Sequence, residues 1–281
     1  MRIESFDRAA DFLVAAEPVF LMNEARTSLM FGIVRRLNEG GRFGDDPPIL
    51  LGAMHGGHLV ALITRTPPYN LLVHVVNAKR FAMSSLISFL RERDPDLPGV
   101  HAERHVARAF AEAWAKERGR PAHVRMEQRL YRLDDVAAIE SAPGRFRLAD
   151  PSDRETLASW VHAFMREATP DDPHPDPGVI VDRHIQARTL ALWDDGGPVS
   201  IAGSSRATPH GASVSLVYTP PAKRGRGYAS SCVAELSRRQ LQSGKAFCTL
   251  FADLANSTSN AIYQRIGYRS VADFTMIEFA G

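Results

Sequence analysis

The sequence predicts a mixed α+β (mixed α/β) protein made of two related domains, each with a central, mostly antiparallel sheet flanked by helices. Two observations support this prediction. The hydrophobic period changes along the chain, from helical spacing to short apolar runs separated by turns. Both halves also follow the same order, with helices first, then a strand meander, then further helix and strand, although no sequence repeat links them. The alternative is one mixed-sheet enzyme domain with an unrelated N-terminal cap.

The N-terminal half begins with Ile3–Ala16, expected to form a short strand or helix start followed by an amphipathic helix. A helix over Met22–Asn38 would place Ala25, Leu29, Ile33 and Leu37 on one face, and Gly40–Gly41 would end it. Glycine- and proline-rich turns then separate short apolar runs, which indicates an antiparallel meander. The later elements are expected as strands at Ile49–His55, His58–Arg65, Leu71–Val76 and His123–Leu133, with helices at Lys79–Glu92 and Glu103–Arg118.

The C-terminal half follows a connector over Asp134–Gly144. A short strand at Arg145–Asp150 leads into a helix that Pro151-Ser152-Asp153 opens and that runs to Ala168. Four prolines between Thr169 and Pro177 make that segment a loop. The remaining helices are expected at Gly178–Arg188, Tyr228–Ser243 and Asn256–Ile266, and the remaining strands at Leu190–Trp193, Pro198–Ser205, Ser213–Tyr218, Phe247–Asp253 and Tyr268–Phe279.

Composition and charge exclude several classes of protein. The chain has 281 residues, 44% hydrophobic and 23% charged, which suits a globular protein with a real core. With 34 basic and 32 acidic residues, nothing indicates a nucleic-acid partner. The apolar runs are too short to cross a bilayer, and the N-terminus lacks a signal core. Cys232 and Cys248 alone form no disulfide framework, so we expect a cytoplasmic protein, monomeric or homodimeric, without a membrane partner.

A basic, glycine-rich turn lies between the strand Ser213–Tyr218 and the helix that starts at Tyr228. Gly225 and Gly227 allow the backbone to approach a ligand, and the first helical turn offers unpaired N–H groups and a favourable dipole for an anion. Three cationic side chains add positive charge. The turn lacks the Gly-Lys-Ser/Thr ending of a P-loop and is not a GxGxxG motif. By itself it could also be a plain basic turn that caps a helix. The cationic residues are Lys223, Arg224 and Arg226.

A second group of residues narrows this interpretation. Arg224-Gly225-Arg226-Gly227-Tyr228-Ala229 together with Asn256, Tyr263 and Gly267-Tyr268 resembles the paired motifs of the GNAT superfamily of acyl-CoA N-acyltransferases. The resemblance covers residues 145–281, and Val217-Tyr218-Thr219-Pro220 is similar to the strand end that precedes the first motif. Residues 1–135 show no counterpart, because Asn77–Ala82 lacks the glycines. The resemblance thus implies an acetyl-CoA-binding catalytic domain at 145–281 after a degenerate GNAT-like or capping domain at 1–135.

The resemblance also implies roles for individual residues. The diphosphate of acetyl-CoA would bind the backbone N–H groups of Arg224, Gly225, Arg226, Gly227, Tyr228 and Ala229. The pantetheine amides would pair with the strand edge at Leu216, Val217 and Tyr218, where an N–H group could also stabilise an oxyanion by about 3 kcal/mol. Asn256 would position the pantetheine arm, or serve only as a helix N-cap. Tyr263 would protonate the leaving thiolate, or be a packed core aromatic.

The sequence leaves several alternatives for the residues that bind and deprotonate the acceptor. Many family members carry a glutamate on the strand before the turn, but Ser213–Tyr218 contains no acid. The candidates for a general base are Glu167, His162, Asp171 and His174, and water-mediated deprotonation is an equal alternative. Acids in the Thr169–Pro177 loop (Asp171, Asp172, Asp176) could attract a cationic amine, or could belong to a solvated loop.

The expected function is therefore transfer of an acetyl group from acetyl-CoA to a primary amine of a small molecule or amino acid. The alternatives are a peptide or protein amine, or a non-catalytic acyl-CoA-binding module. His101 and His105, with Glu103 and His123, lack a compact third ligand, so no metal site is expected.

Overall fold

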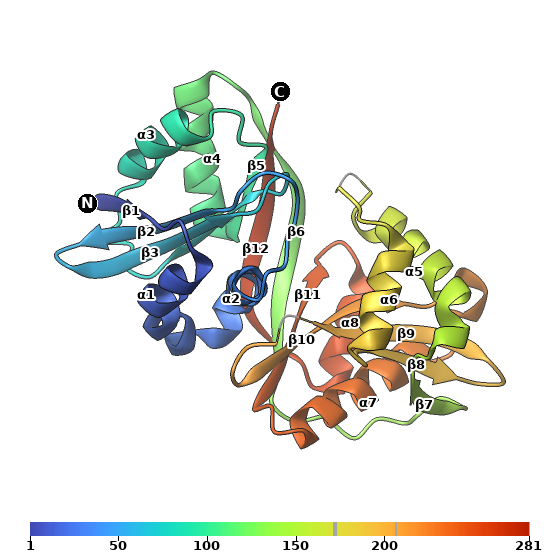
Figure 1. Ribbon diagram of the computed structural model, residues 1–281. Coiled ribbons are helices and arrows are strands. Elements are labelled where there is room, and N and C mark those ends of the chain that lie inside the picture. Colours follow the sequence, from blue (N-terminus) through green and yellow to red (C-terminus); the bar gives the residue numbers. More distant parts are fainter. Residues whose placement is uncertain (171–172, 206, 281) are drawn as a thin grey trace. The chain divides into compact units, whose positions relative to one another are not determined.

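The computed structural model describes residues 1–170, 173–205 and 207–280, which divide into two compact units. Unit 1 contains residues 1–130, 253–255 and the described residues from 271 onward; unit 2 contains the described residues of 131–252 and 256–270. Strands β6 (Ala122–Leu133) and β12 (Arg269–Phe279) contribute residues to both units. The predicted mixed α+β class is confirmed, since helices and strands occur together in both halves of the chain (Figure 1).

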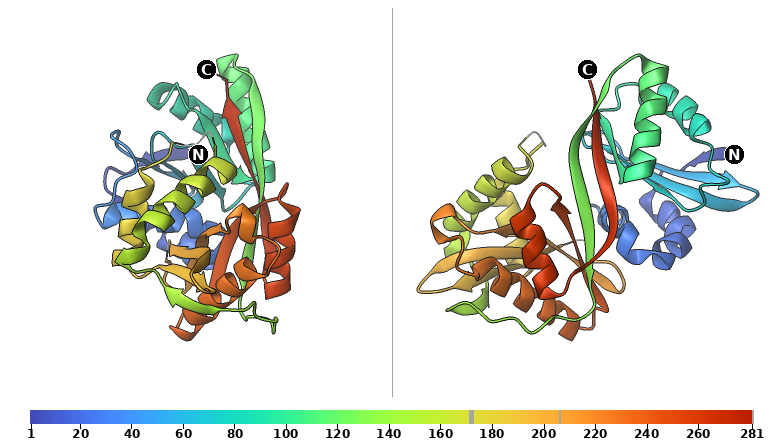
Figure 2. Two further views of the ribbon diagram at one scale, coloured as in Figure 1. Left: turned by 90° about the vertical axis from the view of Figure 1, so that its right-hand side faces the viewer. Right: turned by 180° about the vertical axis from the view of Figure 1, so that it is seen from behind.

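Unit 1 is a seven-strand sheet with the order β1-β2-β3-β4-β5-β12-β6. Its neighbouring strands are antiparallel from β1 to β4 and between β5 and β12, whereas β4 and β5 are parallel. Strands β12 and β6 lie side by side in Figure 1 and in both views of Figure 2. The remaining strands are β1 (Arg2–Ser5), β2 (Ile49–His55), β3 (His58–Arg65), β4 (Leu71–Val75) and β5 (Gly99–Glu103); the helices are α1 (Ala9–Met22), α2 (Glu24–Asn38), α3 (Met83–Arg93) and α4 (Arg104–Arg118).

The sheet of unit 1 is buried on both faces because its strand residues alternate between two cores. Leu51 and Ile63 pack with α3 and α4, while their neighbours Leu50 and Leu62 pack with α1 and α2. The first pair of helices in the sequence therefore covers one face, and the second pair covers the other.

Unit 2 has the strand order β11-β10-β9-β8-β7. All neighbours are antiparallel except β10 and β11, which are parallel. A capping box at Asp150 and Asp153 starts the first helix, as the Pro-Ser-Asp sequence predicts. The strands are β7 (Arg145–Leu148), β8 (Leu190–Asp194), β9 (Pro198–Ser205), β10 (Gly211–Tyr218) and β11 (Phe247–Asp253); the helices are α5 (Arg154–Ala168), α6 (Pro177–Gln186), α7 (Tyr228–Gln242) and α8 (Ser257–Ile266).

Unit 2 repeats the layering of unit 1. Leu192 of β8 belongs to the core under α5 and α6, and its neighbour Trp193 belongs to the core under α7 and α8. The first two helices again cover one face and the last two cover the other. The two units therefore share the order of their elements and the arrangement of helices around their strands.

The structure corrects three details of the sequence analysis. Strand β5 was absent from the predicted elements, and it carries His101. The buried face of α2 contains Phe31 and Val34, whereas Leu29, Ile33 and Leu37 are only partly buried. Most of the closing strand β12 packs in unit 1, where it pairs with β5, although the sequence analysis groups residues 145–281 together.

Candidate functional site

Strand β10 carries a bulge near its C-terminal end. Its register with β9 shifts between Ser215 and Tyr218, and Leu216 has a φ of 51°. Left-handed backbone is uncommon for a residue other than glycine, and bulges often redirect a strand beside a functional site. Ser215, Leu216 and Val217 are partly exposed in a strand that is otherwise buried. The bulge therefore turns a short piece of backbone out of the regular sheet.

Strand β10 pairs with β11 only along its first half. The parallel register runs from Gly211 opposite Phe247 to Ser213 opposite Thr249, and no further pair joins the two described strands. A side-chain bond of 3.0 Å between the Ser213 and Thr249 hydroxyl groups marks the last paired position. The backbone of β10 beyond Ser213 is therefore available on this side for an extended ligand.

The glycine-rich turn connects the free end of β10 to α7. A 3₁₀ turn at Pro221–Lys223 comes first, then Gly225 and Gly227 take φ angles of 77° and 78°. Gly227 is the N-cap of α7, and no side chain caps the helix. The N–H groups of the first helical turn have no partner within the helix, so this end can accept an anion.

Tyr228 anchors the start of α7. Its hydroxyl group donates a 2.6 Å hydrogen bond to the Asp195 carboxylate in the β8–β9 turn. This bond raises the pKa of Tyr228, while Arg226 acts in the opposite direction. The helix end that carries the free N–H groups is thus fixed to the sheet by a charge-assisted hydrogen bond.

Arg224 does not extend freely into solvent. Its guanidinium group pairs with Glu167 at 2.7 Å and donates at 2.9 Å to the Thr219 carbonyl. The Tyr218 hydroxyl group donates to the other oxygen of Glu167 at 3.4 Å, and the guanidinium carbon lies 5.7 Å from the centre of the Tyr218 ring. Burial, followed by the charge of Glu167, raises the pKa of Tyr218. Glu167, a predicted candidate for general base, therefore lies beside the glycine-rich turn.

The second predicted motif forms the start of α8 and its inner face. Asn256 is exposed and is the N-cap of α8, where its side chain accepts from the Ser259 N–H group at 3.0 Å. Its predicted role toward pantetheine stays a prediction, and the capping role exists in either case. Tyr263 is 7% exposed and packs edge-on against Tyr268, with 6.0 Å between ring centres.

Tyr263 keeps its proton over a wide pH range. Burial raises the pKa of its phenol to about 12. None of the residues that the structure describes forms a hydrogen bond with its hydroxyl group. A buried phenol that stays neutral and has a free O–H suits a proton donor, and it also suits a core aromatic, so its catalytic role stays a prediction.

His184 of α6 is a buried polar residue that the sequence analysis did not identify. Its Nδ1 atom lies 2.7 Å from the Thr189 hydroxyl oxygen, and burial lowers its pKa to about 4. A Cβ atom placed on Gly203 would lie 3.5 Å from the His184 Cε1 atom and 3.5 Å from the Leu216 Cβ atom. The imidazole ring is therefore uncharged at neutral pH and packs close to the bulge. The sequence signal that could have identified His184 as buried is its position on the apolar face of a predicted helix.

The other predicted acceptor-side residues are not gathered at the turn by any described contact. His162 and His174 are exposed, and Asp176 is the N-cap of α6, where it accepts from the Val179 N–H group at 3.1 Å. Asp171 and Asp172 lie outside the described residues. Among these candidates, Glu167 alone has a contact with the turn that the structure describes.

The corresponding turn of unit 1 has a different construction. It follows β4, whose register with β3 contains no shift. The N–H groups of Arg80 and Phe81 donate to the Asn77 carbonyl at 3.2 and 3.0 Å, and the Ala82 N–H group donates to the Met1 sulfur at 3.2 Å. Its donors are therefore already used. In the turn of unit 2 the Arg224 N–H group is also used, by the Pro221 carbonyl at 3.2 Å, but the N–H groups of the first turn of α7 have no partner within the helix.

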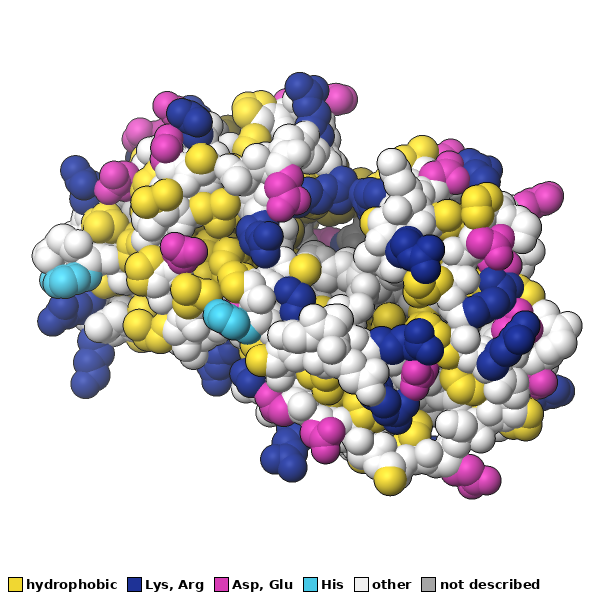
Figure 3. All heavy atoms as spheres, turned by 60° about the horizontal axis from the view of Figure 1, so that its bottom comes forward, with side chains coloured by type: hydrophobic (Ala, Val, Ile, Leu, Met, Phe, Trp, Pro, Cys, Tyr) yellow, Lys and Arg dark blue, Asp and Glu magenta, His cyan; other side chains and the backbone are white. Residues whose placement is uncertain are grey.

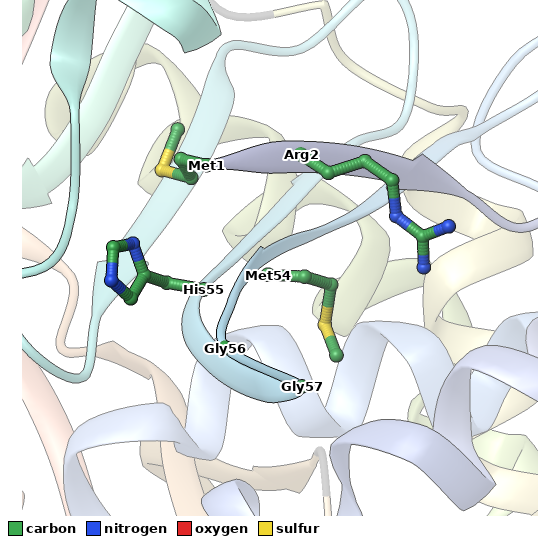
Figure 4. Close-up of a pocket in the computed structure, with 6 residues that line it drawn as sticks. All are labelled: Met1, Arg2, Met54, His55, Gly56 and Gly57. Atoms are coloured by element: carbon green, nitrogen blue, oxygen red, sulfur yellow. The ribbon is translucent and has the colours of Figure 1, made fainter.

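A hollow of about 490 Å³ lies in unit 1 beside the β2–β3 hairpin (Figure 4). Met1 and His55 lie at one end of it and Arg2 and Met54 at the other, and Gly56–Gly57 forms the hairpin tip. Arg2 is paired with Glu4 at 3.1 Å. This lining holds no group of acid–base residues, so we assign the functional site to unit 2.

Three further findings concern ions, membranes and charge. No three His, Cys, Asp or Glu side chains in the described ranges come together as a metal site. None of the described helices has the length and apolar character needed to span a membrane. On the face drawn in Figure 3, basic and acidic side chains are interspersed.

Comparison with known proteins agrees with this geometry. Residues 196–276 match the FR47-like protein family, whereas the sequence matches no curated protein. Solved structures match the full length at low identity. A GNAT-family acetyltransferase from Colwellia psychrerythraea is 12% identical, with a TM-score of 0.59 and 99% of each chain covered. A GCN5-related N-acetyltransferase from Sphaerobacter thermophilus is 15% identical, with a TM-score of 0.63 and coverage of 99% of this chain and 95% of that one.

A tandem GNAT protein from the clavulanic acid biosynthesis pathway is also similar over its length. It is 12% identical, with a TM-score of 0.58, and the match covers 100% of this chain and 98% of the other. At these identities the likeness establishes the fold. The chain therefore has the fold of these GNAT-family and GCN5-related acetyltransferases, and its residues 196–276 are similar to the FR47-like family.

Proposed function

We propose that unit 2 transfers an acetyl group from acetyl-CoA to a primary amine of a small molecule or amino acid. The observation that carries the proposal is the combination of a bulged strand, an uncapped helix start and a glycine turn with two left-handed glycines. An anion suits the helix start and its glycine turn, and an extended amide chain suits the free edge of the bulged strand. Acetyl-CoA contains both, and it supplies the thioester.

The residues of the chain have separate parts in this reaction. The Arg224 N–H group donates to the Pro221 carbonyl at 3.2 Å, so the backbone N–H groups from Gly225 to Ala229 bind the diphosphate, with the Arg224 side chain beside them. The free edge at Leu216–Tyr218 pairs with the pantetheine amides. Tyr263 donates the proton that the leaving sulfur takes up, and burial keeps its phenol protonated for that purpose. Asn256 fixes the start of α8 and offers its amide nitrogen to the pantetheine arm.

Unit 1 has a structural part in the proposal and no acyl-CoA site of its own. Its turn lacks the left-handed glycines, and internal bonds use the N–H groups of Arg80, Phe81 and Ala82. We therefore propose that residues 1–135 contain a degenerate GNAT-like domain and that acetyl-CoA binds within residues 145–281.

The direct test is thiol release from acetyl-CoA. The full-length protein is incubated with acetyl-CoA and each member of a panel of small amines, amino acids and short peptides. The proposal predicts amine-dependent release of coenzyme A, with a small amine or amino acid as the best acceptor. If the protein binds coenzyme A but no amine causes thiol release from acetyl-CoA, it is a non-catalytic module. If peptides are the best acceptors, the acceptor is a peptide amine and not a small molecule.

A further inference from the structure

The Arg224 guanidinium group lies beside a carboxylate and an aromatic ring, an environment that suits a cation. Glu167, at the end of α5, supplies the negative charge at 2.7 Å, and the Tyr218 ring lies 5.7 Å from the guanidinium carbon. Trp160 of α5 packs against the same ring, with 6.4 Å between ring centres. A carboxylate beside an aromatic ring is a favourable environment for a guanidinium or ammonium group. We call Glu167 and the Tyr218 ring the cation site.

The contact between Arg224 and Glu167 is easy to break. Both side chains are about half exposed, at 48% and 49%. Exposed ion pairs are screened by water, and breaking one changes an equilibrium by up to about fivefold. A bidentate contact between arginine and a phosphate group is stronger. A diphosphate at the start of α7 can therefore draw the guanidinium group away from the cation site.

The cation site lies at the end of the strand that carries the bulge. Tyr218 is the last residue of β10, two positions after Leu216, and its hydroxyl group donates to Glu167. The strand itself contains no acid that could attract a positively charged acceptor. Glu167 supplies that charge from a different element, the end of α5.

We propose that Glu167 and the Tyr218 ring bind the positively charged group of the acceptor, and that Arg224 fills this place until the diphosphate of the acyl donor displaces it. The inference rests on the proposed function and specifies its acceptor as a cationic amine. Glu167 is a binding residue in this account. The attacking amine nitrogen releases its ammonium proton to water before it attacks the thioester, and it releases a second proton as the amide forms, which balances the proton that Tyr263 gives to the leaving sulfur. Binding of the donor prepares the acceptor site, because the same arginine cannot occupy both places.

The experiment measures two quantities for the Glu167→Gln protein. Calorimetric titration with coenzyme A should show binding about two- to fivefold tighter than in the wild type, because Arg224 is released from its ion pair. With acetyl-CoA saturating, the KM for the best amine of the panel should rise at least about tenfold, with kcat within about threefold. Glu155→Gln, an exposed acid on the same helix, is the matched control and should change neither value.

Unchanged or weaker coenzyme A binding in Glu167→Gln would overturn the inference, because Glu167 would then not compete with the diphosphate for Arg224. An unchanged KM for the amine would overturn it as well. A wild-type protein that binds no coenzyme A would contradict both the inference and the proposed function. If the wild type binds and acetylates an amine, failure of the Glu167 predictions leaves the proposed function intact.

Discussion

The Tyr228 hydroxyl group donates a 2.6 Å hydrogen bond to Asp195, and this bond ties the first residue of α7 to the β8–β9 turn. The two residues are far apart in the sequence, so the contact fixes the helix start against the sheet. The free N–H groups beside it keep their direction because the helix end is held at a defined place. The position of this helix end therefore depends on the fold around it and not on the loop alone.

Tyr228→Phe should therefore weaken coenzyme A binding while the fold persists. Loss of the bond to Asp195 leaves the helix start less fixed, and we expect the Kd for coenzyme A to rise about three- to tenfold. Calorimetric titration measures this value. The control is Tyr268→Phe, which removes a buried bond of 2.9 Å to Ser237, away from the turn, and should destabilise the protein by about 1 kcal/mol with an unchanged Kd. Equal Kd values for Tyr228→Phe and the wild type would contradict the anchoring role.

Tyr263→Phe should separate proton donation from binding. We expect kcat to fall about 100-fold, because the leaving sulfur loses its donor, while the Kd for coenzyme A stays the same. In the wild type, the rate should show no decline from Tyr263 ionisation below about pH 11, since burial raises its pKa to about 12. Steady-state kinetics from pH 7 to 10 test both statements. Full turnover in Tyr263→Phe would show that Tyr263 is a packed aromatic and not the proton donor.

His184 should make the protein less stable in mild acid. Its pKa is about 4 in the folded state and 6.5 for the free side chain. The unfolded chain therefore binds the proton first, and stability that is present above pH 6.5 is lost as the pH falls toward 4, by up to about 3 kcal/mol. Urea unfolding of the wild type and His184→Gln at pH 7 and pH 4.5 measures the difference. An equal loss in both proteins would show that other groups cause it.

The closing strand should stabilise unit 1. Ile277 of β12 is 3% exposed, lies opposite Val100 of β5, and belongs to the core under α3 and α4. Ile277→Ala should cost about 2–5 kcal/mol through lost burial and a cavity. Val124→Ala, a half-exposed position on β6, is the control and should change stability by less than about 0.5 kcal/mol. Chemical denaturation measures the free energy of unfolding of both variants. Similar losses in Ile277→Ala and Val124→Ala would contradict a stabilising role of β12 in the core of unit 1.

Local sequence patterns predicted most elements because their causes are local. The strands at Ile49–His55 and His58–Arg65 follow from apolar runs around a Gly-Gly turn, and the start of α5 follows from its capping residues. Strand β5 was missed because Gly99–Glu103 is short and contains a histidine and a glutamate. Its place between β4 and β12 depends on pairing with distant segments, which no local pattern encodes.

The site was predicted in part for the same reason. Glycine often adopts left-handed backbone, so this conformation could be predicted at Gly225 and Gly227. Leucine rarely adopts it, so the bulge at Leu216 could not be predicted. The contact of Glu167 with Arg224 joins residues 57 positions apart and depends on how α5 packs against β10. The motif therefore predicted the glycine-rich turn before a helix, and the structure added the Glu167 carboxylate beside it.

The central claim is that the turn at Gly227 binds the acyl donor, and titration of coenzyme A into Gly227→Trp tests it most directly. Gly119→Trp is the matched control, since Gly119 also caps a helix with a left-handed φ of 66° and lies in unit 1. Both substitutions place a tryptophan at a left-handed φ and so impose similar backbone strain, but only Gly227→Trp places an indole ring at the start of α7. We predict loss of coenzyme A binding by at least about 100-fold in Gly227→Trp and an unchanged Kd in Gly119→Trp. Unchanged affinity in Gly227→Trp would contradict the account.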